Sequence, residues 1–404
     1  MRQRIGVIAL LALSTGLLSA AEWTLSGQIR HRFEWDHRAF NADQGANTYH
    51  LLRSRLGVQF SADPVYAYFQ FQDSRTFGTE TSTLTDGSAD HFDLHQGYLR
   101  IRHPFGWRMC LKIGRQEVAL GNQRLMGAVG WHNIGRSFDG LLLKSHLGPM
   151  GLRLFTLRTN ETSAPKDQGD FDLFGLYGTL PVSGLKVEPL LLLEKNYNLP
   201  DSQAIQRFTA YAWLHGGLGP LSYSLEGAYQ GGTQQGLDIA AFLAAAKLGY
   251  TLQNTPAQPG LALGLDFLSG DSDPTDDKLE VFNTLYATNH KFYGYMDYFL
   301  NLPVHTYGLG LQDLYATLSL RPYPGLMAKA TAHLFQAAQD YTLQDGSKTR
   351  TFGNEVDLTL AYRYGENLGV SGGFSVFLPG DIFKEQRGED PATWFYLMTT
   401  VTFK

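Results

Sequence analysis

Hydrophobic and polar residues alternate with a period of two along much of this chain. Between residues 22 and 36, Trp23, Ile29 and Phe33 share one parity, whereas Arg30 and Arg32 share the other. The same alternation recurs in four further segments, at residues 52–60, 65–72, 221–230 and 355–363. Residues 137–147 and 171–180 are apolar on both parities, so the pattern does not orient them. A period of two is typical of strands with one apolar and one polar face, and it predicts an all-β protein.

The connections between these segments alternate between short and long. The short ones carry Gly or Pro, which favour tight turns, and they occur at residues 62–64, 103–106, 147–149, 182–184, 217–220, 321–324 and 365–367. The long ones are polar, for example at residues 77–90, 161–170, 270–305, 339–352 and 380–391. Short periplasmic turns and longer extracellular loops are typical of outer-membrane barrels. Counting hairpins predicts a transmembrane antiparallel β-barrel of about 18 strands.

The first 21 residues predict export. Arg2 and Arg4 precede an uncharged apolar run over residues 5–18, and the small residues 19–21 follow it. This order is typical of a secretory signal peptide. We therefore expect residues 1–21 to be removed and residues 22–404 to form a single barrel domain. No later uncharged run reaches the ~20 apolar residues that a membrane helix needs, so strands would have to cross the membrane.

The last strand carries an assembly signal. Phe395, Leu397, Val401 and Phe403 lie on one parity, and only Lys404 follows them. This apolar ladder resembles the C-terminal recognition signal of outer-membrane barrels. We therefore expect the protein in the outer membrane of a Gram-negative bacterium, with membrane lipid, periplasmic chaperones and the barrel-assembly machinery as partners. The alternative is a secreted soluble β protein, because alternating strands also cover soluble cores.

Composition narrows the function classes. With a single cysteine, Cys110, the chain cannot rely on internal disulfides, and closure of a sheet in lipid is another stabilising device. The 33 Lys and Arg residues fall to 31 when Arg2 and Arg4 are removed, against 38 Asp and Glu, which gives a formal charge of about −7. An acidic chain is not expected to bind nucleic acid. Any preference for anions would have to come from the local placement of basic residues.

Sequence motifs also bear on catalysis and cofactor binding. The chain has no His-Glu-x-x-His pair, phosphate loop or cysteine metal site. Residues 271–277 begin like a calcium loop, but Asp276 and Phe282 stand where an EF-hand needs glycine and glutamate. His290 lies beside Lys291 and aromatic residues, which indicates a packing role. We therefore expect a channel with no catalytic, cofactor-binding or metal site, rather than an enzyme.

Residues 114–140 carry charged residues suited to a narrow pore: Arg115, Glu117, Arg124, Arg136 and Asp139. We expect this stretch to leave the fifth strand, fold into the lumen and re-enter the sheet near Phe138. Arginines at a constriction select anions, because the guanidinium stays charged and binds carboxylates. Strict alternation would point Arg115 at lipid, so this hypothesis needs a bulge or a strand that ends at Gly114. The alternative is a solvated surface loop with ordinary ion pairs.

Two N-terminal segments place four arginines on the polar parity: Arg30, Arg32, Arg53 and Arg55. Antiparallel pairing of the first two strands would bring them together on the lumen face. Such like charges are costly unless counter-charges or a ligand offset them, and Glu34 is a local counter-charge. Mixed charge on the lumen face is also expected from Glu355, Asp357 and Arg363. These groups either orient water and ions or select an anionic substrate.

Several segments resemble the alginate export family of outer-membrane barrels. They are Gly114-Arg115-Gln116-Glu117 with its continuation to residue 140, Leu268-Ser269-Gly270-Asp271, residues 282–297, and Gly353-Asn354-Glu355-Val356-Asp357-Leu358. The segments occur in order along nearly the whole chain. The resemblance implies an eighteen-stranded barrel whose lumen is rich in arginine.

These observations predict a passive outer-membrane porin for anionic solutes. The cargo would be an acidic oligosaccharide, an alginate-like polymer or a small carboxylate, and it would pass an arginine-lined lumen. One alternative is an outer-membrane barrel that is a hydrolase. Another is a porin for uptake of small carboxylates that has no role in polysaccharide export.

Overall fold

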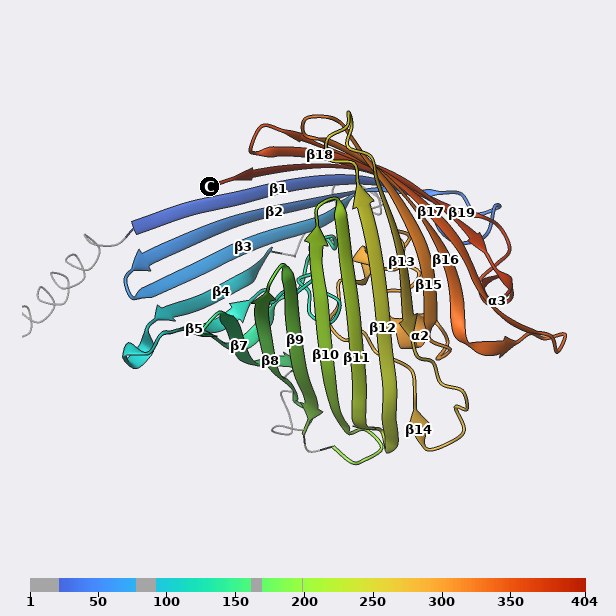
Figure 1. Ribbon diagram of the computed structural model, residues 1–404, viewed down its shortest axis with the longest axis horizontal. Helices are drawn as coiled ribbons and strands as arrows, with labels where there is room; N and C mark the ends of the chain where they lie inside the picture. Colours follow the sequence, from blue (N-terminus) through green and yellow to red (C-terminus); the bar gives the residue numbers. More distant parts are fainter. Residues whose placement is uncertain (1–21, 78–91, 161–168, 198) are drawn as a thin grey trace, which may run out of the picture.

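The structure is a computed structural model that describes residues 22–77, 92–160, 169–197 and 199–404 (Figure 1). The predicted signal peptide at residues 1–21 lies outside the described residues, as do most of the predicted loops at 77–90 and 161–170. Within the described residues, no helix is long and apolar enough to span a membrane. The architecture is a single closed sheet that curves around a central lumen (Figure 1).

Eighteen antiparallel strands form the wall, and the last of them pairs with the first to close it. In chain order they are β1 (Glu22–His37), β2 (Asn47–Ala62), β3 (Val65–Phe77), β4 (Phe92–Arg102), β5 (Met109–Gln116), β6 (Phe138–Leu147), β7 (Met150–Asn160), β8 (Phe171–Val182), β9 (Leu185–Asn196), β10 (Ile205–Leu218), β11 (Leu221–Gln234), β12 (Leu237–Thr251), β13 (Gly260–Leu268), β15 (Leu311–Tyr323), β16 (Leu326–Thr342), β17 (Lys348–Tyr364), β18 (Leu368–Pro379) and β19 (Ala392–Phe403). A further short strand, β14 (Lys278–Leu279), pairs in parallel with β12. The predicted barrel of about 18 strands is confirmed.

The period-two pattern separates the two faces of the wall. On β1, Trp23, Leu25 and Ile29 are more than half exposed on the outer face, whereas Arg30 and Arg32 are buried on the lumen side. The other strands repeat this division. Exposed apolar side chains around the outside of a closed sheet are stable against lipid and not against water, so the wall is that of a transmembrane barrel.

The longest loops lie at one end of the barrel, which is the extracellular end of this architecture, and the connections at the other, periplasmic end are short. The loop predicted at residues 339–352 is wrong, because β16 and β17 extend through most of it and leave only residues 343–347 as a connection. Arg350 and Asp340 form an ion pair across the two strands (2.5 Å), so the polar sequence marks strands that rise into water. At the same end, Gln235 and Gly236 alone join β11 to β12, and both have positive φ (56° and 86°), as two-residue hairpins require.

Four short helical segments lie in the described connections: η1 (Pro104–Gly106), η2 (Asn289–Lys291), α2 (Leu302–His305) and α3 (Asp381–Gln386). η1 belongs to a periplasmic turn. α3 follows β18 at the extracellular end, where its buried Ile382 and Phe383 cover the barrel rim. η2 and α2 belong to the long connection between β13 and β15, which enters the lumen.

The closing strand carries its apolar ladder on the outer face. Phe395, Leu397, Val401 and Phe403 are all exposed there, as the sequence predicts. Phe403 pairs with Gly27 of β1, and a Cβ added to Gly27 would lie 2.1 Å from the Phe403 ring. The ring therefore covers the glycine at the seam, which links the terminal phenylalanine to barrel closure.

Candidate functional site in the barrel lumen

Two long connections fold into the barrel. The β5–β6 loop covers residues 117–137, and the β13–β15 loop covers residues 269–310. Both loops bury apolar side chains completely or nearly so: Val118, Leu125, Met126, Phe282, Tyr293, Met296 and Phe299. Both loops also contact wall residues whose side chains face the lumen. Of the stretch 114–140 that was expected to fold inward, residues 117–137 lie inside the barrel, and its ends belong to β5 and β6.

The two loops bind each other through their main chains. Gly127 N donates to Tyr286 O (2.8 Å) beside a parallel bridge between Met126 and Tyr286. The guanidinium of Arg136 donates to the carbonyls of Tyr286 and Ala287. The loops therefore form one unit inside the barrel, here called the partition. Arg136 stabilises this unit and is not a free pore charge.

The predicted N-terminal arginine cluster holds the tip of the β5–β6 loop. Its members are Arg30 and Arg32 on β1, and Arg53 and Arg55 on β2. Arg30 and Arg53 are direct register partners, so the predicted clustering on the lumen face is confirmed. Each of the four donates to a main-chain carbonyl within residues 130–134, at 2.6 to 3.2 Å. The cluster therefore binds the protein's own loop.

Carboxylates offset part of this positive charge. Glu34 accepts from Arg32 (2.6 Å), as predicted. Glu117 accepts from Arg55 (3.1 Å) and forms a second hydrogen bond with His95 (2.7 Å). Burial alone would raise the pKa of Glu117, but the hydrogen bond with His95 and the charge of Arg55 lower it below its usual value. Glu117 therefore remains ionised as a counter-charge at the base of the loop.

Arg124 connects the β5–β6 loop to the other side of the wall. It is buried and pairs with Asp266 on β13 (2.6 Å) and Glu226 on β11 (3.1 Å). The Tyr293 hydroxyl lies 3.0 Å from the guanidinium, whose plane covers the Phe292 ring at 3.9 Å. Burial alone would lower the pKa of Arg124, but the negative charge of Asp266 raises it. The tip of the same loop is held by arginines of β2, whereas Arg124 pairs with Glu226 on β11. Because β2 and β11 lie opposite each other in an eighteen-strand barrel, the loop spans the lumen.

The predicted acidic pair on β17 holds the β13–β15 loop. Met296 N donates to Glu355 (2.9 Å), and Tyr295 N donates to Asp357 (3.4 Å). Ser375 on β18 donates to Asp357 as well. The wall thus binds its two loops by complementary means. Arginines bind carbonyls of the first loop, and carboxylates bind amides of the second.

Arg115 and Asp139 do not face the lumen, contrary to the sequence-based hypothesis. They form a cross-strand ion pair on the outer surface (2.8 Å), with side chains 43% and 52% exposed. They share the parity of the outward-facing Ile113 and Leu141. Neither the bulge nor the strand end that the hypothesis required occurs, because β5 keeps its register through Gly114 with both neighbouring strands.

Arg363 lies at the periplasmic mouth, where it lines a depression together with Arg321, Ser371 and Thr400. Ser371 is the centre of a Gly-x-Ser-x-Gly sequence at residues 369–373. In hydrolases this motif needs a sharp turn from strand to helix, and here it lies within the extended strand β18. The local structure therefore does not present Ser371 as a nucleophile.

The acidic segment at residues 271–277 forms its own local hydrogen bonds. The side chains of Asp271, Asp273 and Asp276 each accept from the backbone N–H two residues farther along. Among the described residues, no group of three or more His, Cys, Asp or Glu side chains is arranged to hold a metal ion.

The partition separates two cavities. The extracellular cavity has a volume of about 370 Å³ and is lined by Arg32, Trp131 and Asp297, among others. The periplasmic cavity has a volume of about 520 Å³. His290 lies between them, stacked on Trp131 (4.3 Å between ring centroids) and on Tyr295 (5.0 Å). His290 thus packs the partition, as the sequence suggested.

Sequence reasoning missed a group of basic residues on four consecutive strands. We call it the basic arc: Arg100 on β4, Lys112 on β5, Lys144 on β6 and Arg153 on β7. Arg100 pairs in register with Lys112, and Lys144 with Arg153. All four have the parity opposite to exposed outer residues such as Leu99, so they face the lumen. The period-two alternation of β4 and β5 already places Arg100 and Lys112 on the parity opposite to the outward-facing residues, so the sequence could have indicated these two members of the arc.

The basic arc is not neutralised by carboxylates. None of its four side chains has an ion-pair partner in the part of the chain that the structure describes. Arg100 and Lys112 instead lie over the rings of Tyr66 (4.2 Å) and Tyr98 (3.7 Å). Tyrosine rings position a cation by weak attraction and leave its charge in place. The arc is therefore a positive surface on the periplasmic half of the lumen.

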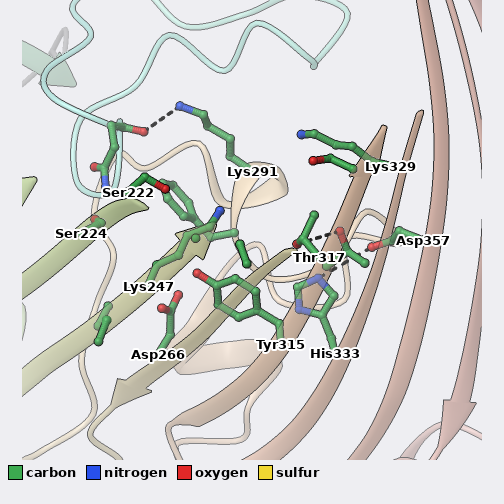
Figure 2. Close-up of a pocket in the computed structure, with 18 of the residues that line it drawn as sticks. Ser222, Ser224, Lys247, Asp266, Lys291, Tyr315, Thr317, Lys329, His333 and Asp357 are labelled. Atoms are coloured by element: carbon green, nitrogen blue, oxygen red, sulfur yellow. Dashed lines mark hydrogen bonds and ion pairs between the residues drawn. The ribbon is translucent and has the colours of Figure 1, made fainter. Parts of the chain in front are cut away.

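Three more lysines line the periplasmic cavity. Figure 2 shows Lys247 on β12, Lys291 in η2 and Lys329 on β16 around the same space. Lys291 donates to the carbonyl of Asn122 (3.0 Å). Burial lowers the pKa of Lys291, and the positive charges of Arg124 and Lys329 lower it further.

Comparison with known proteins decides the family. A family model described as alginate export matches residues 22–396. The chain belongs to the alginate export family. No curated protein matches it. The sequence-based assignment to this family is confirmed.

Solved structures share the fold at low sequence identity. Pseudomonas aeruginosa OpdO is 15% identical, with a TM-score of 0.64 over 95% of this chain and 97% of that one. Acinetobacter baumannii OccAB4 is 14% identical, with a TM-score of 0.64 over 94% and 98%. Pseudomonas aeruginosa OccK2 (OpdF), solved in complex with glucuronate, is 15% identical, with a TM-score of 0.62 over 95% and 98%. This member of the alginate export family is an outer-membrane porin barrel of a Gram-negative bacterium, surrounded by lipid.

Proposed function

We propose that this member of the alginate export family is a passive, anion-selective porin for small carboxylates. The observation that carries the proposal is the basic arc, which presents four cations to the lumen without ion-pair partners among the described residues. Charges of one sign along a low-dielectric passage raise the local concentration of the opposite ion. Rings of Arg and Lys favour anions in pores for this reason.

The arginines that the sequence singled out have another role in this account. Arg30, Arg53 and Arg124 hold the partition, so their charges are engaged by carbonyls or carboxylates. A positive charge attracts an anion at ~4 Å by about 1 kcal/mol in bulk water and about 4 kcal/mol at an effective dielectric near 20. Only charges that permeating ions can approach contribute this attraction. The basic arc meets this condition better than the buried arginines do.

Small cargo is favoured over a polymer by the partition. The two loops are bound to opposite sides of the wall and to each other, so a polymer would have to displace them. The cavities on either side, about 370 and 520 Å³, fall within the size range of small-molecule sites. The glucuronate bound to OccK2 supports the same class of cargo.

A second candidate cargo is an acidic oligosaccharide or an alginate-like polymer. The family description, alginate export, favours it. The same basic arc would attract such a chain, and the partition would have to swing aside to admit it.

Liposome swelling tests the proposal. Vesicles that contain the purified porin should admit sodium glucuronate several times faster than glucose, which has nearly the same size and no charge. The variant Lys112→Gln with Lys144→Gln should lose most of this difference. Lys348→Gln is the matched control, because Lys348 is an exposed lysine near the extracellular turn. Equal entry of glucuronate and glucose into wild-type vesicles would overturn the proposal.

A further inference from the structure

The periplasmic cavity has the features of a ligand site as well as of a passage. Its volume of about 520 Å³ is in the range of preformed small-molecule sites. Residues of the partition, among them Phe292 and Tyr295, close it toward the extracellular side. Its other walls come from β10 to β13 and from β15 to β17. A solute that enters from the periplasm is therefore held among several fixed elements.

The charges in this cavity are unbalanced. Lys247, Lys291 and Lys329 have no ion-pair partner among the residues that the structure describes. Three carboxylates line the cavity, and each is already engaged: Glu226 and Asp266 pair with Arg124, and Asp357 accepts from Ser375 and from the backbone of Tyr295. Three ammonium groups from separate elements therefore share one space without a counter-charge. Like charges in close proximity are costly unless an anion offsets them, so an anion would stabilise this arrangement.

Hydroxyl groups form most of the remaining polar lining. They belong to Ser222, Ser224, Thr251, Tyr315, Thr317, Ser319 and Thr331. Thr317 and Thr331 are hydrogen-bonded to each other (3.2 Å), which fixes two of them on adjacent strands. A hydroxyl both donates and accepts, so such a lining matches the hydroxyls of a sugar.

The aromatic rings of the cavity offer little free surface. The Trp213 ring stacks on His215 at 3.6 Å, and Gly121 covers it so closely that a Cβ there would lie 3.3 Å away. Phe292 is covered by the guanidinium of Arg124 at 3.9 Å. Tyr315 is stacked on His333 at 5.5 Å between ring centroids. A flat aromatic acid would therefore find these rings already covered. The chemistry of the cavity favours a carboxylate that carries hydroxyls.

We propose that the periplasmic cavity is a binding station for a single sugar acid, whose carboxylate is held by Lys247, Lys291 and Lys329 and whose hydroxyls meet the Ser and Thr side chains. This station rests on the proposed anion channel and adds a stoichiometric site to it. Because the station lies on the periplasmic side of the partition, a solute in the periplasm reaches it directly. A solute from outside the cell has to pass the partition first. A neutral sugar lacks the charge, and an aromatic acid lacks the hydroxyls.

The test measures block of chloride current through single channels in planar bilayers. Glucuronate added on the periplasmic side should reduce the current with saturation, as expected for one site. Glucose should not reduce it, and benzoate should act only at concentrations about tenfold higher or more. Lys329→Gln and Lys247→Gln, each made separately, should raise the half-blocking concentration of glucuronate about tenfold, because each removes one charge contact.

Two controls separate this proposal from the channel proposal. Lys329→Arg keeps the charge and should retain block within a factor of about two, whereas Lys348→Gln should not alter it. Heat-modifiable mobility on gels confirms that each variant is folded. If Lys247→Gln or Lys329→Gln does not insert, Lys291→Gln takes its place, because Lys291 lies in a loop. Block that is unchanged in the lysine variants, in a channel that still prefers chloride to potassium, would overturn the station alone. A channel without that preference would overturn the anion channel itself.

Discussion

Arg124 and Asp266 form a buried ion pair, 2.6 Å between Nη1 and Oδ2, that fixes the β5–β6 loop to β13. The side chains are 3% and 2% exposed, so neither charge is hydrated. Glu226 on β11 also pairs with Arg124. Because the arginine cluster of β1 and β2 binds the tip of the same loop, the loop is fixed at both ends. The position of the partition in the lumen depends on these contacts.

Removal of Arg124 should loosen the partition. Arg124→Gln leaves the carboxylates of Asp266 and Glu226 buried without their partner, a loss that typically costs about 3–5 kcal/mol. The barrel wall should still close, because its backbone hydrogen bonds are unaffected. We expect larger and noisier single-channel conductance. Arg350→Gln, which breaks an exposed pair with Asp340, is the control and should behave like wild type. Conductance as low and steady as that of wild type in Arg124→Gln would show that the pair does not hold the loop.

The barrel was predictable from the sequence, because alternation, turn residues and the final apolar ladder are local signals. The inward loop was also predictable, since its charges suit a lumen. The residues with which those charges pair were not predictable from the sequence. Arg124 meets Asp266, which is 142 positions away in the chain, and no local pattern links them. Whether an arginine is a free pore charge or a structural contact is decided by such distant partners.

For Arg115, strict alternation predicts an outward side chain, and the pore-lining hypothesis departed from that rule. Its parity pointed outward, and the structure follows that parity. Asp139 lies in a segment that is apolar on both parities, so only pairing across β5 and β6 reveals that it faces the same way. The basic arc was overlooked for a related reason, because its members are spread singly over four strands and form a group only when the sheet is assembled.

Neutralisation of Arg115 should leave ion selectivity unchanged. The side chain lies on the outer surface and pairs with Asp139, so permeating ions do not meet it. We expect Arg115→Gln to insert and to show the reversal potential of wild type in a potassium chloride gradient. The same measurement on Lys112→Gln should show a shift toward cations. A shift in Arg115→Gln as large as in Lys112→Gln would contradict the outward placement.

The terminal phenylalanine should matter for assembly more than the lysine after it. Phe403 covers Gly27 at the seam and completes the apolar ladder, whereas Lys404 follows the last strand. Phe403→Ala should therefore lower the amount of folded protein in outer-membrane fractions several-fold. Lys404→Ala should leave it near the wild-type amount. Normal levels of both variants would show that the closing contact is dispensable.

Salt should weaken the selectivity of the channel in a defined way. Electrostatic screening acts over ~10 Å at 0.1 M ionic strength and ~3 Å at 1 M. If partner-free cations of the lumen set the preference for anions, the preference should be strong at low salt and fade near 1 M. Recordings at both concentrations check this, and a preference that is independent of salt would point to steric selection instead.

The reversal potential across a roughly tenfold potassium chloride gradient centred near 0.1 M tests the central claim most directly. We predict a potential of the sign that reports chloride permeation in the wild-type porin and in Lys348→Gln. The potential should move toward zero or change sign in Lys112→Gln with Lys144→Gln, which removes half of the charge of the basic arc. A wild-type channel that prefers potassium, or a double variant that matches wild type, would contradict the conclusion that the arc makes this barrel an anion channel.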